Sequence, residues 1–222
     1  MYNYMKKTYH IIVTFFFRIL YKRKSYNYSR SYYYNRLLDG YKSIQLYLKL
    51  MNDLKNTNGI ETNTKIQLID NKKNNEINKK NIIKKYGNPN YKFICEDLSE
   101  IEILSYRQKL GSHKTRLEFH FYKDNLFFHT YTFSYLSPKE KNEIIKIIKD
   151  KYLGREYRDI KGHHIVDKNQ NIILLNDIFD FSIKYSNKNN IVLETILNHN
   201  EFQKSKDENK RKRDKEILYK GL

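Results

Sequence analysis

A strict alternation of apolar and polar side chains between residues 116 and 122 constrains the fold of this chain more than any other feature. Leu117, Phe119 and Phe121 recur at every second position, which is the period that a strand with one buried face requires. A second apolar run, residues 126–135, follows the turn residues Asp124 and Asn125. The pattern therefore predicts an antiparallel hairpin.

The register of this hairpin depends on its loop. If Asp124 and Asn125 form a two-residue loop, the facing pairs are His120 with His129, Glu118 with Tyr131, and Arg116 with Phe133. Paired residues point to the same side of a sheet, so all six side chains are expected on one face.

Further strands are expected where short apolar runs lie between turn residues, at 64–69, 91–95, 101–109, 163–166, 171–175, 178–185 and 191–197. One helix is expected from Asp39 to Asn58-Gly59, and a second ends before Gly87 and Pro89. A capping box, Ser137 to Glu140, opens a third helix, which ends at Gly154. Short turns between strands favour antiparallel pairing over crossover units.

These elements predict an α+β fold, with an antiparallel sheet or two meanders packed against two to three helices. A chain of 222 residues has room for one such domain with extensions. We place a basic targeting-like or disordered extension at 1–38, a single α+β domain at 39–200 and a charged tail at 201–222. In the tail, acids are interspersed with Arg211-Lys212-Arg213, a mixture typical of a solvated helix end.

The charge of the chain is uneven. The formal net charge is +18, and a chain rich in Lys and Asn without Ala or Trp also fits an AT-rich genome. Composition of that kind does not explain residues 1–38, which hold eight Lys or Arg and no Asp or Glu. Residues 11–20 form an apolar run that contains Arg18 and is too short to cross a bilayer, so no transmembrane helix is expected here.

Drawn as a helix, this run is amphipathic and basic, which is typical of a transit peptide for an organelle. The mitochondrion is the organelle that we expect. Three alternatives stay open: a secretory signal, a membrane-surface helix at residues 9–24, and an arm that binds nucleic acid. In that last case Arg23, Arg30 and Arg36 contact phosphates, and Tyr28 and Tyr33 stack on bases. A cytoplasmic or secreted location is the alternative to import.

No motif of a known catalytic class is present. The seven glycines are too far apart to form a phosphate-cradling loop, and no H-E-x-x-H occurs. The single cysteine, Cys95, lies beside Phe93 in an apolar strand, where a buried and inert thiol is expected. We therefore expect a protein without enzymatic activity and without a cofactor.

The predicted register brings one candidate metal site together. Two imidazoles paired across the hairpin, His120 and His129, with Glu118 two residues away, have donor types that hold zinc. A shift of one residue separates the histidines, and paired rings on a sheet face are also ordinary packing. For these two reasons we expect that the histidines hold no metal.

The helix, the stop at Gly87 and Pro89, and the three-strand meander of residues 78–135 resemble the small two-layer fold of outer-membrane assembly lipoproteins and of inhibitors built from the same unit. The resemblance implies a binding fold. Those lipoproteins carry a lipidated cysteine near the N-terminus, whereas Cys95 is internal.

An acid-free leader joined to a body without catalytic motifs favours a non-catalytic accessory or assembly subunit of an organellar complex, held by other protein subunits. The alternative is a basic RNA-binding or organellar ribosomal protein, with RNA as its partner.

Overall fold

The computed structural model describes residues 40–67, 77–154, 160, 162–177 and 180–221. Within these ranges the helices are α3 (Gln45–Asn56), α4 (Lys79–Tyr86), α5 (Pro138–Tyr152) and α6 (Ile191–Gly221). The strands are β1 (Asn58–Thr62), β2 (Tyr91–Ile94), β3 (Ile101–Leu110), β4 (His113–Tyr122), β5 (Asn125–Phe133), β6 (His163–Asp167), β7 (Asn171–Asn176) and β8 (Phe181–Asn187). The predicted α+β class is confirmed.

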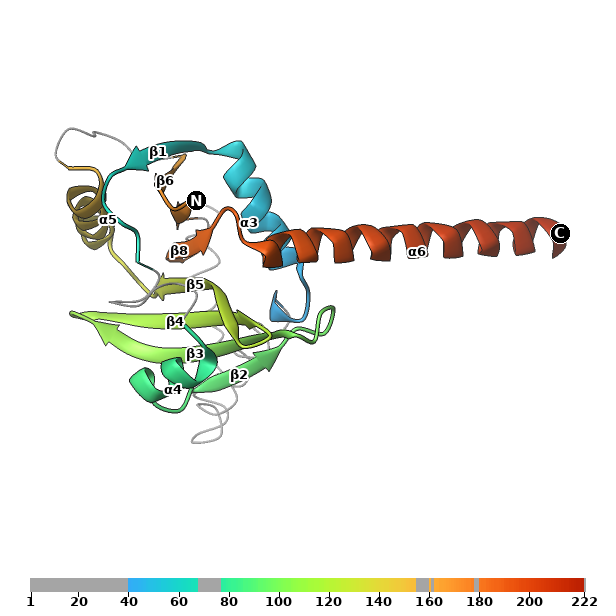
Figure 1. Cartoon of the computed structure of the whole chain (residues 1–222), viewed down its shortest axis with the longest axis horizontal. Helices are drawn as coiled ribbons and strands as arrows, with labels where there is room; N and C mark the ends of the chain where they lie inside the picture. The colour runs from blue at the N-terminus through green and yellow to red at the C-terminus, as the bar shows by residue number, and fades with distance from the viewer. Residues whose placement is uncertain (1–39, 68–76, 155–159, 161, 178–179, 222) are drawn as a thin grey trace, which may run out of the picture.

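All of these strands join in one eight-stranded sheet, ordered β1-β6-β7-β8-β5-β4-β3-β2 (Figure 1). Strands β2 to β5 form one antiparallel meander and β6 to β8 another, and pairing of β5 with β8 merges them. The expectation of antiparallel pairing is wrong at one edge, where β1 runs parallel to β6. Their connection passes through the first meander and α5, so the chain returns in the same direction.

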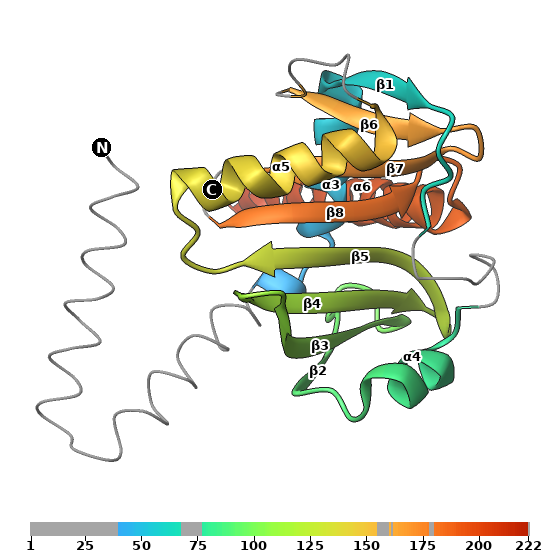
Figure 2. The same ribbon diagram turned by 90° about the vertical axis from the view of Figure 1, so that its left-hand side faces the viewer.

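Helices cover both faces of the sheet. Figure 2 shows α5 in front of the strands, with α3 and the start of α6 behind them. On the α5 face, Ile144, Ile148 and Tyr152 pack against β5 to β8, while α4 covers the other end of the same face through Ile82. The opposite face packs against Tyr47 and Leu50 of α3 and against the first turns of α6.

Local signals explain where two helices begin and end. Ser137 accepts a hydrogen bond from the Glu140 amide, and the Glu140 carboxylate accepts one from the Ser137 amide, so the predicted capping box opens α5. Asn78 caps α4 by accepting from the Asn81 amide. After α4, Gly87 has φ 78°, a conformation that glycine adopts without strain.

Two predicted strands are wrong. Residues 191–197 form the first turns of α6, because Val192, Leu193 and Ile196 lie on one helical face and pack into the core beside α3. The Asn190 side chain accepts from the Val192 amide at 2.9 Å and so supports the helix start. Residues 64–67 form no strand, and the strand near them, β1, begins earlier, at Asn58.

The boundary predicted at residue 200 falls inside α6, so the charged tail is a continuation of that helix as far as Gly221. The predicted 1–38 extension lies outside the described residues. Among the helices that are described, none is long and apolar enough to cross a membrane.

Candidate functional site

A row of mostly polar side chains crosses the face of the sheet that α3 covers. Strand pairing places Ser105, Glu118, Thr130 and Lys184 side by side on β3, β4, β5 and β8. The row continues through Leu174 of β7 to His164 of β6. Directly paired residues share a face, so these side chains form one row beneath α3, which is polar except at Leu174.

Glu118 carries the negative charge of the row. It is 2% exposed, and its Oε1 accepts hydrogen bonds from the Tyr41 hydroxyl and, at 2.6 Å, from Arg116 Nε. A carboxylate at such depth is costly unless it is paired and hydrogen-bonded. The two donors therefore hold Glu118 in a fixed position inside the fold.

The two histidines of the predicted metal site lie on opposite faces of the sheet. His120 pairs with Phe128, and His129 pairs with Phe119, so the predicted register is wrong. The loop is Lys123–Asp124, with φ 46° and 72°, not Asp124–Asn125. Two adjacent positive φ angles indicate a type I′ turn, and a bulge between His120 and Phe121 shifts the pairing once more.

Consequently Glu118 faces Thr130 and Arg116 faces Thr132, and the predicted six-residue face does not form. Glu118 and His120 share a face, because they are two residues apart on β4. Across the described part of the chain, no group of three or more His, Cys, Asp or Glu side chains is arranged to hold a metal ion.

Each histidine is packed among aromatic rings. The Tyr47 hydroxyl lies 2.8 Å from His120 Nδ1, and the His129 ring stacks on Tyr185 with centroids 4.4 Å apart. Burial lowers the pKa of both His120 and His129 to about 3, and for His120 the nearby His129 and Arg116 add to the effect. Both rings are therefore neutral at physiological pH and sealed from substrates.

His164, at the end of the row, has a defined tautomer. The Thr57 hydroxyl donates to the Asp53 carbonyl at 2.8 Å, so its oxygen accepts from His164 Nδ1–H, also at 2.8 Å. Among the described residues, the lone pair on Nε2 has no hydrogen-bond partner, and it faces Gly59, where an added Cβ would lie 3.1 Å away. Burial lowers the pKa of His164 to about 4, with contributions from Lys188 and His163.

Lys184 connects the row to α3. Its Nζ lies 3.9 Å from Asp53 Oδ2, and its side chain is 12% exposed. Burial lowers the pKa of Lys184, whereas Asp53 raises it and Lys49 lowers it further. Together with Glu118 and Tyr41, this pair attaches the helical layer to the sheet, so the polar row is best explained as part of the scaffold.

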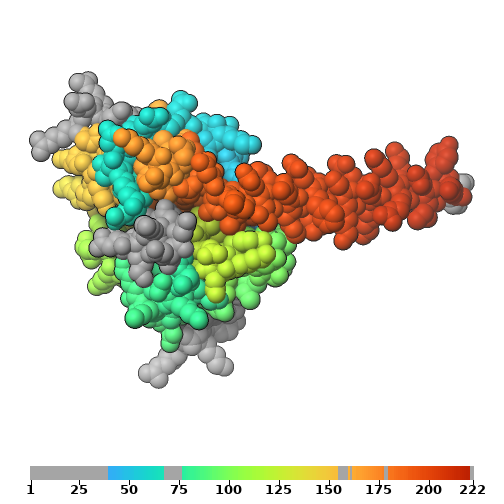
Figure 3. All heavy atoms as spheres, in the orientation of Figure 1, coloured from blue at the N-terminus to red at the C-terminus, as the bar shows by residue number. Residues whose placement is uncertain are grey.

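The outer half of α6 is an extended surface that is open to a partner. Val192, Leu193 and Ile196 are buried in the body, but every residue from 201 to 220 is exposed. A helix rises about 1.5 Å per residue, so this half extends about 30 Å from the body. Figure 3 shows it standing clear of the rest of the described chain.

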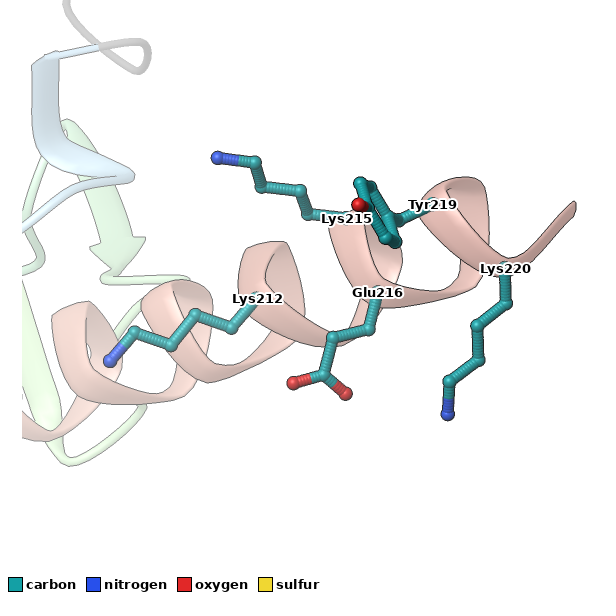
Figure 4. Close-up of a pocket in the computed structure, with 5 residues that line it drawn as sticks. All are labelled: Lys212, Lys215, Glu216, Tyr219 and Lys220. Carbon is teal, nitrogen blue, oxygen red and sulfur yellow. The ribbon is translucent and has the colours of Figure 1, made fainter. Parts of the chain in front are cut away.

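Large apolar side chains are exposed on this outer half: Phe202 by 67%, Ile217 by 69%, Leu218 by 64% and Tyr219 by 88%. Figure 4 shows the last turns, where Lys215 and Tyr219 project to one side and Lys212, Glu216 and Lys220 to the other. These five side chains bound an open, shallow surface rather than an enclosed cavity. A surface of this kind does not enclose a small molecule.

The nucleic-acid candidates Arg23, Arg30, Arg36, Tyr28 and Tyr33, and the candidate membrane-contact segment 9–24, lie outside the described residues. The projecting helix was missed in the sequence. A signal for it exists, because no Pro or Gly interrupts residues 191–220. Acids also stand four residues before cations at Asp207–Arg211, Glu208–Lys212 and Glu216–Lys220, a spacing that supports an exposed helix.

Comparisons with known protein families, with curated proteins and with solved structures find no match to this chain.

Proposed function

We propose that this chain is a non-catalytic accessory or assembly subunit of an organellar complex, with the mitochondrion as the first compartment to test. Helix α6 is the arm by which it holds a partner. The observation that carries the proposal is that residues 201–220 are helical yet exposed on every side.

Most helical stability in proteins comes from packing of an amphipathic face rather than from the helix propensity of the residues. The outer half of α6 has no such packing against the described part of the body, and it presents large apolar side chains to solvent. A partner that covers part of this surface removes apolar area from water and stabilises the helix.

The absence of enzymatic activity is supported by the placement of the groups with catalytic chemistry. Glu118, His120 and His129 are each at most 2% exposed and are packed or paired within the fold. The compartment is supported by the sequence of residues 1–38, whose cations are unaccompanied by acids.

The test is the size of the native complex. The tagged full chain and a chain that ends at Asn200 are expressed in the native cells, and each is separated on native gels from organelle extracts. We expect the full chain to migrate well above its own 27.2 kDa and the shortened chain to shift to a smaller species. Full chain that migrates as a monomer contradicts the proposal.

Two controls complete the experiment. Thermal unfolding of the shortened chain should match that of the full chain, because residues 201–220 are all exposed and belong to none of the hydrophobic clusters of the described residues. Mass spectrometry of the mature N-terminus should find a start near residue 38. An intact N-terminus in a cytoplasmic pool contradicts the import part of the proposal.

A further inference from the structure

We propose that one face of the outer half of α6 binds the phosphate backbone of RNA. This inference rests on the proposed role of α6 as an arm, and it names the chemistry of what the arm contacts. The face is defined by six residues spaced three or four apart: Phe202, Lys206, Lys210, Arg213, Ile217 and Lys220.

Residues three and four apart on a helix are neighbours, so these six side chains form one stripe along the axis. Each residue turns the helix by about 100°. Seen down the axis, Glu216 is the first acid on one side of the stripe and Asp214 the first on the other, and no acid lies in the arc between them that holds the stripe. The five acids of residues 201–220 lie on the remaining surface, interleaved with Lys204, Arg211, Lys212 and Lys215. The helix is therefore basic on one face and mixed on the other.

The four cations of this basic face are available for a partner. All are exposed, and within the described residues no ion pair joins any of them to an acid. They span 15 residues, from Lys206 to Lys220, or about 21 Å along the helix. A polyanion of comparable length complements such a row.

The composition of the face distinguishes RNA from two other partners. A partner helix needs an apolar seam at this spacing, but between Phe202 and Ile217 the stripe holds only cations, whose desolvation is costly. A membrane surface needs a broad apolar face opposite the charges, whereas α6 carries acids there. A phosphate backbone attracts cations that remain partly solvated, through release of its counterions, and exposed aromatic residues can stack on bases.

Counterion release gives the expected magnitude. For single-stranded nucleic acid the slope of log K against log salt changes by about 0.7 for each phosphate contact. Four contacts give a slope of about 2.8, which is roughly 600-fold in affinity between 0.1 M salt and the 1 M reference.

The test compares two variants of the full chain that lose the same charge. In the face variant, Gln replaces Lys206, Lys210, Arg213 and Lys220; in the control variant, Gln replaces Lys204, Arg211, Lys212 and Lys215. Each loses three Lys and one Arg, so net charge and helix propensity match. Anisotropy of a fluorescent 20-nucleotide poly-U RNA reports binding from 50 to 300 mM salt, and circular dichroism checks that α6 remains helical.

We expect the face variant to lose most of the part of the slope of log K against log salt that α6 contributes. At 0.1 M salt it should bind RNA at least a hundredfold more weakly than the wild type. The control variant should change less than tenfold. Basic residues elsewhere in the chain contribute equally to both, so they cancel in the comparison. Equal weakening of the two variants overturns the proposal, because it means that total charge and not the basic face determines binding.

Two further probes separate the other partners. Polyglutamate that competes as well as RNA of equal charge, or vesicles with 30% phosphatidylserine that bind the chain more tightly than RNA, overturn the assignment to RNA. If the full chain forms no large native complex but still binds RNA through the basic face, the proposed function alone is contradicted. A complex that persists while the two variants bind RNA alike contradicts only this inference.

Discussion

Acid should destabilise the fold through its buried histidines, and His129 provides the clearest test. Burial holds the pKa of His129 at about 3, whereas an unfolded chain has a histidine pKa of about 6.5. Below pH 6.5 the unfolded state therefore binds more protons than the folded state. Stability contributed by the neutral ring is complete above that pH and is lost as the pH falls toward 3.

The magnitude follows from the two pKa values. Between pH 7.5 and pH 5.0, one histidine with this shift removes about 2 kcal/mol from the free energy of unfolding. The variant His129→Phe keeps a ring stacked on Tyr185 but cannot be protonated. On going from pH 7.5 to pH 5.0, the free energy of unfolding of this variant should therefore fall by about 2 kcal/mol less than that of the wild type, whatever its stability at neutral pH.

Urea unfolding followed by circular dichroism at pH 7.5 and pH 5.0 measures the difference. Phe119→Leu is the control, because Phe119 packs beside the His129 ring and carries no titratable group. It should lower stability at both pH values and keep the wild-type difference between them. If His129→Phe loses as much stability on acidification as the wild type, the assignment of a neutral, buried His129 is refuted.

Four other single substitutions test the scaffold by urea unfolding. The Asp167 carboxylate accepts four hydrogen bonds and the residue is 4% exposed, so Asp167→Ala should lower the free energy of unfolding by about 3–5 kcal/mol. Asp177 forms a more exposed ion pair with Lys141, so Asp177→Ala should lower it by at most about 1 kcal/mol. Ser137→Ala removes one half of the α5 capping box and should cost about 1 kcal/mol. Gly59→Ala places a Cβ against His164 and should lower the free energy of unfolding by about 1–3 kcal/mol. When it is combined with His164→Ala, the total loss should be smaller than the sum of the two single losses, whereas additive losses contradict the contact.

Patterns confined to a few neighbouring residues predict this structure well. The capping box at Ser137 and the end of α4 at Gly87 are found where they are expected, because side-chain caps and backbone conformation act within one turn of a helix. The alternation in residues 116–122 likewise identifies β4.

Features that depend on one residue of register, or on contacts distant in sequence, are not predicted. The turn at Lys123–Asp124 and the bulge after His120 leave His120 on the face of Glu118 but place His129 on the opposite face, although the predicted register puts both histidines on one face. Parallel pairing of β1 with β6 joins segments about a hundred residues apart and leaves no local pattern.

Helix α6 shows a third limit. The apolar run Ile191 to Leu197 is too short to distinguish a strand from a helix by periodicity alone, and its burial beside α3 decides the outcome. The charge segregation that motivates RNA binding is visible only once residues 201–220 are known to be helical, because it is a property of the helix surface.

Hydrogen exchange of the amides of residues 201–220 tests the central claim, that the outer half of α6 is an arm for a partner, most directly. In the purified protein these amides should exchange much faster than those of β4 and β5, since the exposed helix opens locally. In the native complex they should become protected, while exchange in the sheet stays unchanged. Protection equal to that of the sheet in the free protein, or no added protection in the complex, contradicts the account.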